Sequence, residues 1–239
     1  MEKFNSDFEH FWSLIDNNIN FTFARYADGE VMLMKGQAVS DGTQASSIDK
    51  WKAPNTLTKV GEQLLKTLNH VEDNYFYAIS STSDNINDYT FLKNNIKQKE
   101  DNLTFVNLWI NANYKSMLKN ICSNKREVIL ICNKNAKKEN FPFNVIDITP
   151  FPDDCITFWE ENCDNFINEL SLKYKDYNNK LFFISCGPIS EIIIHNLYLL
   201  NPNNSYIDVG SSIDEFVHGF KTRPYMENNT IYSNMISSF

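Results

Sequence analysis

Short apolar stretches recur along the chain with room for a helix between most of them, and this alternation constrains the fold more than any other feature. The apolar stretches are 21–25, 75–80, 103–107, 128–132, 144–148, 181–185 and 205–209. The segments 56–71, 111–122, 158–174 and 189–200 carry apolar residues three and four positions apart, as amphipathic helices do. This alternation predicts an α/β fold with a largely parallel sheet covered by helices on both faces.

The composition is that of a packed globular protein. Of the 239 residues, 42% are hydrophobic and 14% aromatic, and only 7 are Gly and 7 Pro. This length is enough for one sizeable core. Since no repeat, low-complexity tract or convincing linker divides the sequence, we expect a single domain over residues 1–239.

The charge balance argues against a nucleic-acid partner. The net charge is -8 and the pI is near 5.0, whereas binding to a phosphate backbone needs a surplus of clustered Lys and Arg. The short basic cluster at 134–138 is interrupted and is typical of a solvated loop.

The cysteines and the N-terminal segment bear on the compartment. The five cysteines are odd in number, form no Cys-x-x-Cys pair and lie partly inside apolar stretches, as reduced thiols of an intracellular protein do. Residues 1–18 predict an amphipathic helix with acidic residues throughout and lack the pattern of a secretory signal. No segment approaches the ~20 apolar residues of a membrane span. We therefore expect a cytoplasmic protein with no transmembrane segment.

The clearest βαβ unit lies near the C-terminus. Residues 181–185 are a predicted strand, 186–188 a turn with Pro188 at the first helical position, and a helix extends to about Leu200 before the strand at 205–209. Ligands of such sheets bind beyond the carboxyl ends of the strands. The candidate residues are therefore those that follow each predicted strand: 28–30, 80–83, 107, 133, 187–188 and 208–214.

The Asp28-Gly29-Glu30 tripeptide follows the first predicted strand. Its two carboxylates can meet one hard cation, with the glycine permitting a tight turn, and Mg²⁺ or Mn²⁺ held in this way usually also binds substrate phosphates. Arg25 would add a second positive group for a leaving diphosphate. The alternative is that Asp28 caps a helix and Glu30 favours its first turn. From these residues alone the helix cap is favoured, because Asp-x-Glu is a common tripeptide.

Two later segments offer further contacts. The Gly187-Pro188 turn can leave helix N-terminal N–H groups for an anion, although most such turns bind nothing, and Cys186 before it is best explained as a buried structural thiol. In 208–214, Asp208 offers a carboxylate for sugar hydroxyls, Gly210 and Ser211 offer N–H groups, and Asp214 is a candidate base. A helix cap at Ser211 or Ser212 explains that segment equally well.

Several common site types are absent from the sequence. Histidines 10, 70, 195 and 218 share no metal-ligand spacing, so a zinc site is not expected, and His195 in an apolar segment is typical of a structural histidine. There is no Gly-x-Gly-x-x-Gly, Gly-Lys-Ser/Thr or Gly-x-Ser-x-Gly motif. Dehydrogenases, P-loop NTPases and α/β-hydrolases are accordingly disfavoured.

Taken in order, five segments resemble one protein family. They are FARYADGE at 23–30, GTQ at 42–44, NLWINANY at 107–114, the long segment 183–214, and TRPY at 222–225. The chain resembles the bacterial and viral GT-D-type glycosyltransferases, once catalogued as a domain of unknown function. Their members have an Arg-x-Gly-Asp-Gly-Glu-like opening, a late strand-Gly-Pro-helix unit and an Asp-Ile/Val-Gly segment. The chain departs from this pattern at Ala27, where the family often has Gly, and 46–100 matches only loosely.

The resemblance implies a Rossmann-like fold and a nucleotide-sugar donor such as UDP-glucose or UDP-galactose. It also implies a divalent cation, Mn²⁺ or Mg²⁺, at Asp28 and Glu30. By the same resemblance, Arg25, Gln44, Gly187 and Asp208 become candidate donor contacts, beside Pro188, Gly210 and Ser211 from the turns described above.

We therefore expect transfer of a hexose from a nucleoside diphosphate to a hydroxyl of a glycan or glycoprotein acceptor. Asp28 and Glu30 would hold the metal, Arg25 would assist the leaving diphosphate, and Asp214 would deprotonate the acceptor if the reaction inverts. Two alternatives stay open. One is a metal-dependent nucleotide or sugar-phosphate hydrolase, and the other is a non-catalytic nucleotide-sugar-binding subunit of a glycan-assembly complex.

Overall fold

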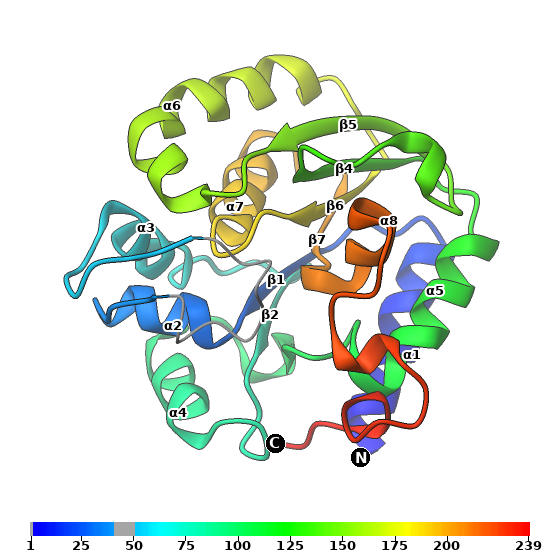
Figure 1. The fold of residues 1–239 in the computed structure, drawn as a ribbon, viewed down its shortest axis with the longest axis horizontal. Coiled ribbons are helices and arrows are strands. Elements are labelled where there is room, and N and C mark those ends of the chain that lie inside the picture. The colour runs from blue at the N-terminus through cyan, green and yellow to red at the C-terminus, as the bar shows by residue number, and fades with distance from the viewer. Residues whose placement is uncertain (1, 41–50) are drawn as a thin grey trace.

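The computed structural model describes residues 2–40 and 51–239 (Figure 1). Its centre is a sheet in the order β3-β2-β1-β7-β6-β4-β5, with every neighbouring pair parallel. The strands are β1 (Thr22–Tyr26), β2 (Tyr75–Ile79), β3 (Leu103–Phe105), β4 (Val128–Asn133), β5 (Val145–Phe151), β6 (Leu181–Ser185) and β7 (Ser205–Asp208). Each of the seven predicted apolar stretches forms one of these strands, and the predicted α/β class is confirmed.

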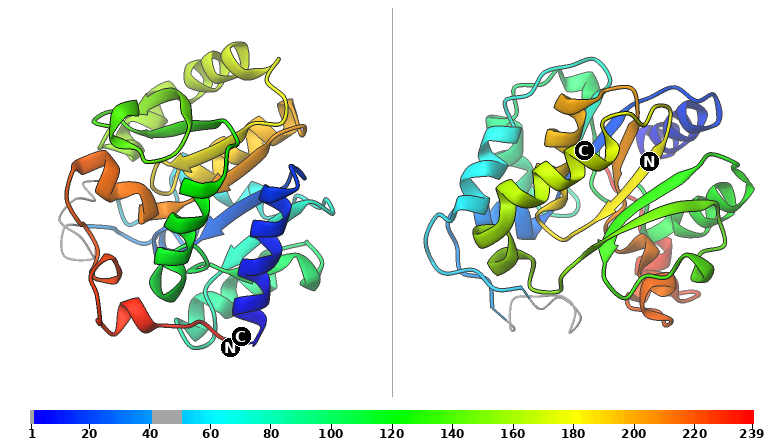
Figure 2. Two further views of the ribbon diagram at one scale, coloured as in Figure 1. Left: turned by 90° about the vertical axis from the view of Figure 1, so that its right-hand side faces the viewer. Right: turned by 90° about the horizontal axis from the view of Figure 1, so that it is seen from above.

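Helices cover both faces of the sheet, as predicted (Figures 1 and 2). One face packs against α2 (Asp28–Met34), α3 (Lys59–Thr67), α4 (Ile86–Asn95), α6 (Cys155–Tyr174) and α7 (Ser190–Leu200). The other packs against α1 (Glu2–Asp16), α5 (Tyr114–Ser123) and α8 (Asp214–His218). Short 3-10 turns are η1 (Glu100–Asn102), η2 (Asn111–Asn113), η3 (Lys138–Asn140), η4 (Gly210–Ile213), η5 (Pro224–Met226) and η6 (Tyr232–Asn234).

The two covered faces explain why the strands are apolar almost without interruption. Val128 to Cys132 of β4 and Leu181 to Ile184 of β6 are buried on both sides. When both faces of a sheet are dry, polar side chains are left mainly to the ends of its strands. No helix of the described residues has both the length and the apolar character that crossing a bilayer requires.

The differences from the sequence-based predictions include one helix that was not predicted, a longer strand and a later helix start. Helix α4 was not predicted, because its pattern is weak; Asn85 starts it by accepting the N–H groups of residues 87 and 88. Strand β5 continues to Phe151 through Pro150, which an edge strand tolerates. Helix α7 begins at Ser190, so Pro188 lies in the preceding turn and not at the first helical position.

The neighbouring strands β1 and β7 mark the point where the chain departs to opposite faces. After β1 it enters α2, whose Val31 and Leu33 join the core of one face. After β7 it enters η4 and α8, whose Ile213 and Val217 join the core of the other. Such a divergence leaves a crevice at the carboxyl ends of the strands, the usual place for a ligand in an open α/β sheet.

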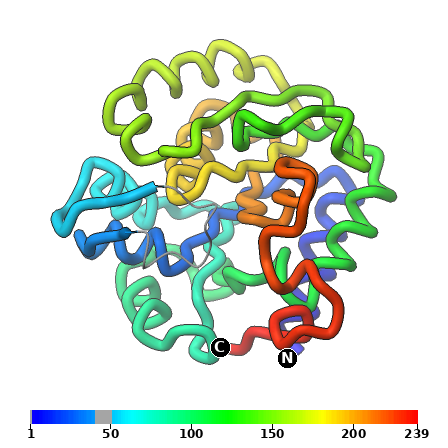
Figure 3. The backbone as a smooth tube through the Cα atoms, in the orientation of Figure 1, coloured from blue at the N-terminus to red at the C-terminus, as the bar shows by residue number. Residues whose placement is uncertain are grey.

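The C-terminal segment returns to the far side of the sheet and packs beside the start of α1 (Figure 3). The Phe239 ring stacks on Phe105 with centroids 4.2 Å apart, and Lys3 Nζ lies 5.8 Å from the Phe239 ring centroid. This packing covers the end of the sheet formed by β2 and β3 and leaves the crevice at β1 and β7 accessible.

Candidate functional site

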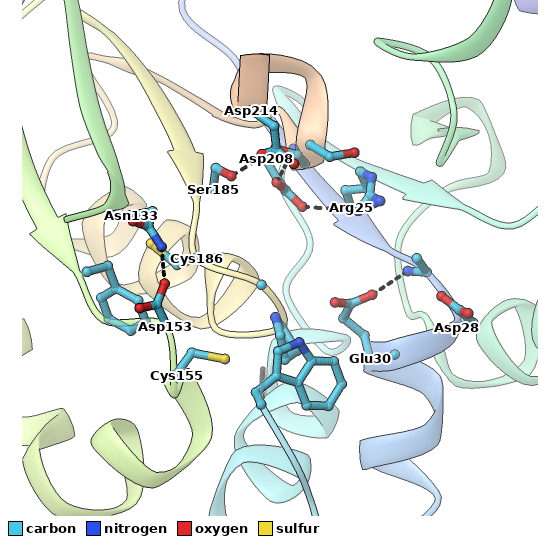
Figure 4. Close-up of a pocket in the computed structure, with 18 of the residues that line it drawn as sticks. Arg25, Asp28, Glu30, Asn133, Asp153, Cys155, Ser185, Cys186, Asp208 and Asp214 are labelled. Carbon is cyan, nitrogen blue, oxygen red and sulfur yellow. Dashed lines mark hydrogen bonds and ion pairs between the residues drawn. The ribbon is translucent and has the colours of Figure 1, made fainter. Parts of the chain in front are cut away.

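A cleft of about 330 Å³ opens at the carboxyl ends of the strands (Figure 4). Its size lies within the ~300–1,000 Å³ typical of small-molecule sites. Residues that follow β1, β4, β5, β6 and β7 all contribute to its wall. The lining includes these candidates from the sequence analysis: Arg25, Asp28, Gly29, Glu30, Asn133, Gly187, Pro188, Asp208, Gly210, Ser211 and Asp214.

The other candidates lie elsewhere. Gln44 is outside the described residues. Ser80 to Ser83 and Asn107 do not line the cleft. Ser81 Oγ instead bonds Asp84 at 2.7 Å, and Thr82 Oγ1 donates to the Ser238 carbonyl at 3.2 Å. The sheet end at β2 is thus occupied by the C-terminal segment.

The Asp28-Gly29-Glu30 tripeptide is the first turn of α2. The Ala27 N–H donates to Glu30 Oε2 at 2.7 Å, which satisfies one of the amides that a helix start leaves open. Ala27 is the capping position, so the alternative in which Asp28 caps the helix is wrong by one residue. Asp28 is exposed at the rim of the cleft, whereas Glu30 is buried beneath it. Helix formation and a metal-binding role therefore use the same residues without excluding each other.

Gly29 serves a purpose other than the expected tight turn. It lies inside α2, and a Cβ at this position would stand 3.2 Å from Trp51 Cζ2. A Cβ on Gly187, which has a φ of +57°, would stand 3.6 Å from Trp51 Nε1. The Trp51 indole thus lies between the turn after β1 and the turn after β6. Gly29 leaves room for one edge of this ring.

Arg25, at the end of β1, is the cation at the centre of the site. Its Nη1 lies 3.8 Å from Asp208 Oδ2, and the other oxygen of Asp208 accepts the Gly210 N–H at 2.7 Å. Gly210 has a φ of +52°, and a Cβ there would be 3.0 Å from Arg25 Cζ. Glycine is required at this position both for the left-handed backbone and for the approach of the guanidinium.

Three buried carboxyl groups surround this one guanidinium. Glu30, Asp208 and Glu191 are 6%, 3% and 0% exposed. Burial raises the pKa of Glu30 to about 7, although Arg25 acts to lower it. Burial also raises the pKa of Asp208 and holds that of Glu191 well above its usual range. For Arg25, burial lowers the pKa, but the three carboxyl groups together raise it above its ordinary value.

Glu191 shows how strongly negative this cluster is. Among the described residues, neither of its carboxyl oxygens meets an N–H or O–H donor. Burial raises the pKa of Glu191, and the negative charges of Asp208 and Glu30 add to this effect. The cluster therefore carries more acidic groups than Arg25 can neutralise.

This excess of buried oxygen ligands fits a divalent cation. Carboxylate oxygens suit Mg²⁺ and Mn²⁺, and a bound cation would favour the charged forms that burial disfavours. Among the described residues there is no group of three or more His, Cys, Asp or Glu side chains that could by itself enclose a metal ion. Asp28 and Glu30 could supply one or two ligands, with substrate oxygens completing the coordination shell.

The opposite wall comes from α8 and the segment after it. Asp214 and His218 are one helical turn apart and both line the cleft. Thr222 Oγ1 donates to Asp214 Oδ2 at 2.8 Å, and Ser211 Oγ bonds Tyr225 Oη at 2.8 Å. Ser211 and Ser212 both lie inside η4, and the capping positions are Val209 for η4 and Ile213 for α8. The prediction that one of these serines caps a helix is therefore wrong. This wall places a carboxylate beside the cleft.

The turn after β6 is held by side chains of its own. Ser190 Oγ accepts the Cys186 N–H at 2.9 Å, and the Cys186 thiol donates to the Ile131 carbonyl at 3.3 Å. Burial holds the pKa of this thiol well above its usual value. Cys186 has the surroundings of a structural thiol and not those of a nucleophile.

Sequence reasoning missed several residues of the site, among them Trp51, Asp153 and Glu191. Asp153 was missed because the predicted strand stopped at residue 148, whereas β5 ends at Phe151. A carboxylate inside the apolar segment 189–194 was a usable signal for Glu191. Trp51 had no such signal, since it reaches the cleft only through the tertiary fold.

Comparisons with known proteins bear on the fold. No protein-family model and no curated protein matches the chain. One similar solved structure is described by the statement that the highly conserved domain of unknown function 1792 has a distinct glycosyltransferase fold. It is 13% identical, with 95% of this chain and 87% of that chain covered and a TM-score of 0.56.

A second similar structure is described as a new glycosyltransferase (DUF1792) from Streptococcus sanguinis. It is 10% identical, with 93% of this chain and 91% of that chain covered and a TM-score of 0.60. The chain therefore has the fold of this domain, as the resemblance in sequence implied. At such low identity the likeness concerns the fold, and the chemistry has to be argued from the cleft.

The raised pKa of Glu30 predicts a pH dependence of stability in metal-free protein. Between the pKa of an unfolded Glu, ~4.3, and the folded value of about 7, the folded chain binds a proton that the unfolded chain releases. The contribution of Glu30 to the free energy of unfolding is therefore complete at low pH, and it is lost as the pH rises through 7. Glu30→Gln keeps an oxygen for the Ala27 N–H but does not titrate.

Urea unfolding in EDTA at pH 5 and pH 8 measures this effect. Relative to Glu30→Gln, the wild-type protein should lose on the order of 2 kcal/mol over this interval. Glu9→Gln, at an exposed site on α1, is the control and should follow the wild type. Equal changes in wild type and Glu30→Gln would show that Glu30 is not the titrating group.

Proposed function

We propose that this protein is a metal-dependent glycosyltransferase. It moves a hexose from a nucleoside-diphosphate sugar, UDP-glucose or UDP-galactose, to a hydroxyl of a glycan or glycoprotein acceptor. The observation that carries the proposal is the gathering of the partly buried Arg25 and several carboxyl groups in a single cleft. The cleft lies where β1 and β7 diverge, in a fold shared with a structure described as a glycosyltransferase.

The diphosphate of the donor binds at the β1 side of the cleft. Asp28 and Glu30 would hold Mn²⁺ or Mg²⁺, which would supply positive charge for the departing diphosphate. Arg25 supplies a second, fixed positive charge, held by Asp208 from behind. Because the guanidinium is partly buried and already oriented by Asp208, little reorganisation is needed when negative charge develops.

The remaining donor contacts come from the turns after β6 and β7. Gly187 and Pro188 shape the wall next to Trp51, and Ser211 lines the opposite side with its hydroxyl held by Tyr225. The Gly210 N–H is already bonded to Asp208. Asp208 and Gly210 therefore act on the donor through Arg25 and not by direct contact. Gln44 remains a candidate donor contact from sequence alone.

Asp214 is the proposed base. In an inverting transfer, the acceptor oxygen forms a bond to the anomeric carbon while the bond from that carbon to the diphosphate oxygen breaks. The electron pair leaves with the diphosphate, and the hydroxyl proton passes to the Asp214 carboxylate. Asp214 is 9% exposed at the cleft wall, and Thr222 fixes one of its oxygens.

Release of nucleoside diphosphate from a panel of nucleotide sugars, with Mn²⁺ or with EDTA, tests this function. We expect turnover with UDP-hexoses that stops in EDTA and falls about 100-fold or more in Asp28→Asn. Asp101→Asn, at an exposed site outside the cleft, is the matched control. Equal release of free sugar with and without acceptor would indicate a hydrolase. Binding of the nucleotide sugar without any turnover would indicate a non-catalytic subunit of a glycan-assembly complex.

Asp214→Asn should lower kcat by a factor of about 100 to 10,000, the usual contribution of a positioned base. Its affinity for UDP should match that of the wild type, because the diphosphate lies with Arg25 and α2. The control is Glu215→Gln, since the Glu215 carboxylate bonds Tyr114 Oη and does not line the cleft. Undiminished turnover by Asp214→Asn would remove this residue from the role of base.

A further inference from the structure

Two polar side chains at the far end of the cleft have no part in the transfer step. Asn133 ends β4, and Asp153 lies two residues after the end of β5. The Asn133 Nδ2 donates to Asp153 Oδ1 at 2.5 Å. Figure 4 shows this pair across the cleft from Arg25, Asp28 and Glu30. The question is which part of a ligand such a pair would meet.

The pair is held in a fixed orientation. Asn133 Oδ1 accepts the Asn135 N–H at 3.0 Å, which sets the amide so that its nitrogen faces Asp153. Lys134 Nζ lies 3.4 Å from Asp153 Oδ2, so an ion pair also holds the carboxylate. Among the described residues, Asp153 is the one acceptor that Nδ2 meets, which leaves its second amide hydrogen for a ligand. Each oxygen of a carboxylate can accept more than one hydrogen bond.

The cleft therefore presents an N–H donor and a charged acceptor side by side at one end. This combination suits groups that both donate and accept, such as the imide edge of a pyrimidine or the two hydroxyls of a ribose. A carboxylate at a strand end is a common partner of ribose hydroxyls in parallel sheets. A phosphate is disfavoured at this end, because Asp153 would repel it.

The spacing of the strands indicates which part of the donor reaches this far. In the sheet, β7 and β6 lie between β1 and β4, so β4 is three strand spacings, or ~14 Å, from β1. That span is comparable to the extended length of a nucleoside diphosphate. With the diphosphate near Arg25, the nucleoside can extend along the strand ends to Asn133.

We propose that Asn133 and Asp153 form the nucleoside subsite of the donor and set the preference for one nucleotide over others. This inference rests on the proposed function, since it takes the diphosphate to lie at Arg25, Asp28 and Glu30. The acceptor then occupies the side of the cleft lined by Asp214 and His218. The donor and acceptor thus enter from different walls.

The test uses Asp153→Asn, which removes the charged acceptor, and Asn133→Asp, which keeps the oxygen that accepts the Asn135 N–H but removes the N–H donor. The matched control is Asp154→Asn. Asp154 is adjacent in sequence, caps α6 by accepting the Thr157 N–H and does not line the cleft. Asparagine is also a good cap, so the control should fold normally. Thermal midpoints establish that each variant is folded.

The dissociation constants of UDP, CDP and 2′-deoxy-UDP are measured by calorimetry with Mn²⁺ and without acceptor. We expect UDP to bind at least tenfold more weakly to Asp153→Asn and Asn133→Asp than to the wild type or the control. A reduced ratio between UDP and CDP would assign the pair to the base. A reduced ratio between UDP and 2′-deoxy-UDP would assign it to the ribose.

Two outcomes would overturn the proposal in different ways. If wild type binds UDP and transfers hexose, but both cleft variants bind all three nucleotides as wild type does, the subsite is wrong and the proposed function stands. A higher KM for the acceptor in those variants would then assign the pair to the acceptor. If the wild type binds none of the nucleotides, the proposed function fails and the subsite fails with it.

Discussion

The burial of three carboxyl groups beside the single guanidinium of Arg25 is the constraint on which the rest of the site depends. Charges are costly to bury, and burial therefore shifts the pKa of a carboxyl group upward. This shift is seen for Glu30, Asp208 and Glu191. Such an arrangement weakens the fold at neutral pH, and a divalent cation would relieve it. A cluster of this kind is expected where a protein is built to bind a cation and an anion together.

The sheet explains why these groups meet. Both faces are covered by helices, so apolar side chains fill the strands and polar ones are displaced to the strand ends. Because every neighbouring pair is parallel, the carboxyl ends of β1, β7, β6, β4 and β5 lie along one edge. The divergence of the chain after β1 and β7 keeps that edge open between α2 and α8. A charged centre at one end and the Asn133–Asp153 pair at the other follow from the same geometry.

Much of this arrangement could be predicted from the sequence, since periodicity identified all seven strands and the rule for parallel sheets pointed to the residues after them. The predictions failed where local pattern and tertiary context differ. Pro150 made β5 look shorter than it is, because only its place at the sheet edge makes that proline acceptable. Gly29 looked like a turn residue, yet its missing side chain accommodates Trp51, which lies far from it in sequence. The role of Glu191 likewise depends on neighbours that the linear sequence does not bring together.

We propose that the cluster around Arg25, Asp28 and Glu30 binds a divalent cation and a nucleoside diphosphate as one unit. Calorimetric titration of UDP into the protein, once with Mn²⁺ and once with EDTA, tests this coupling. We expect UDP to bind at least tenfold more tightly with Mn²⁺, and Glu30→Gln to remove most of this difference, because the shared ligand is lost. Equal UDP affinity in Mn²⁺ and in EDTA would show that the cluster does not bind the two together.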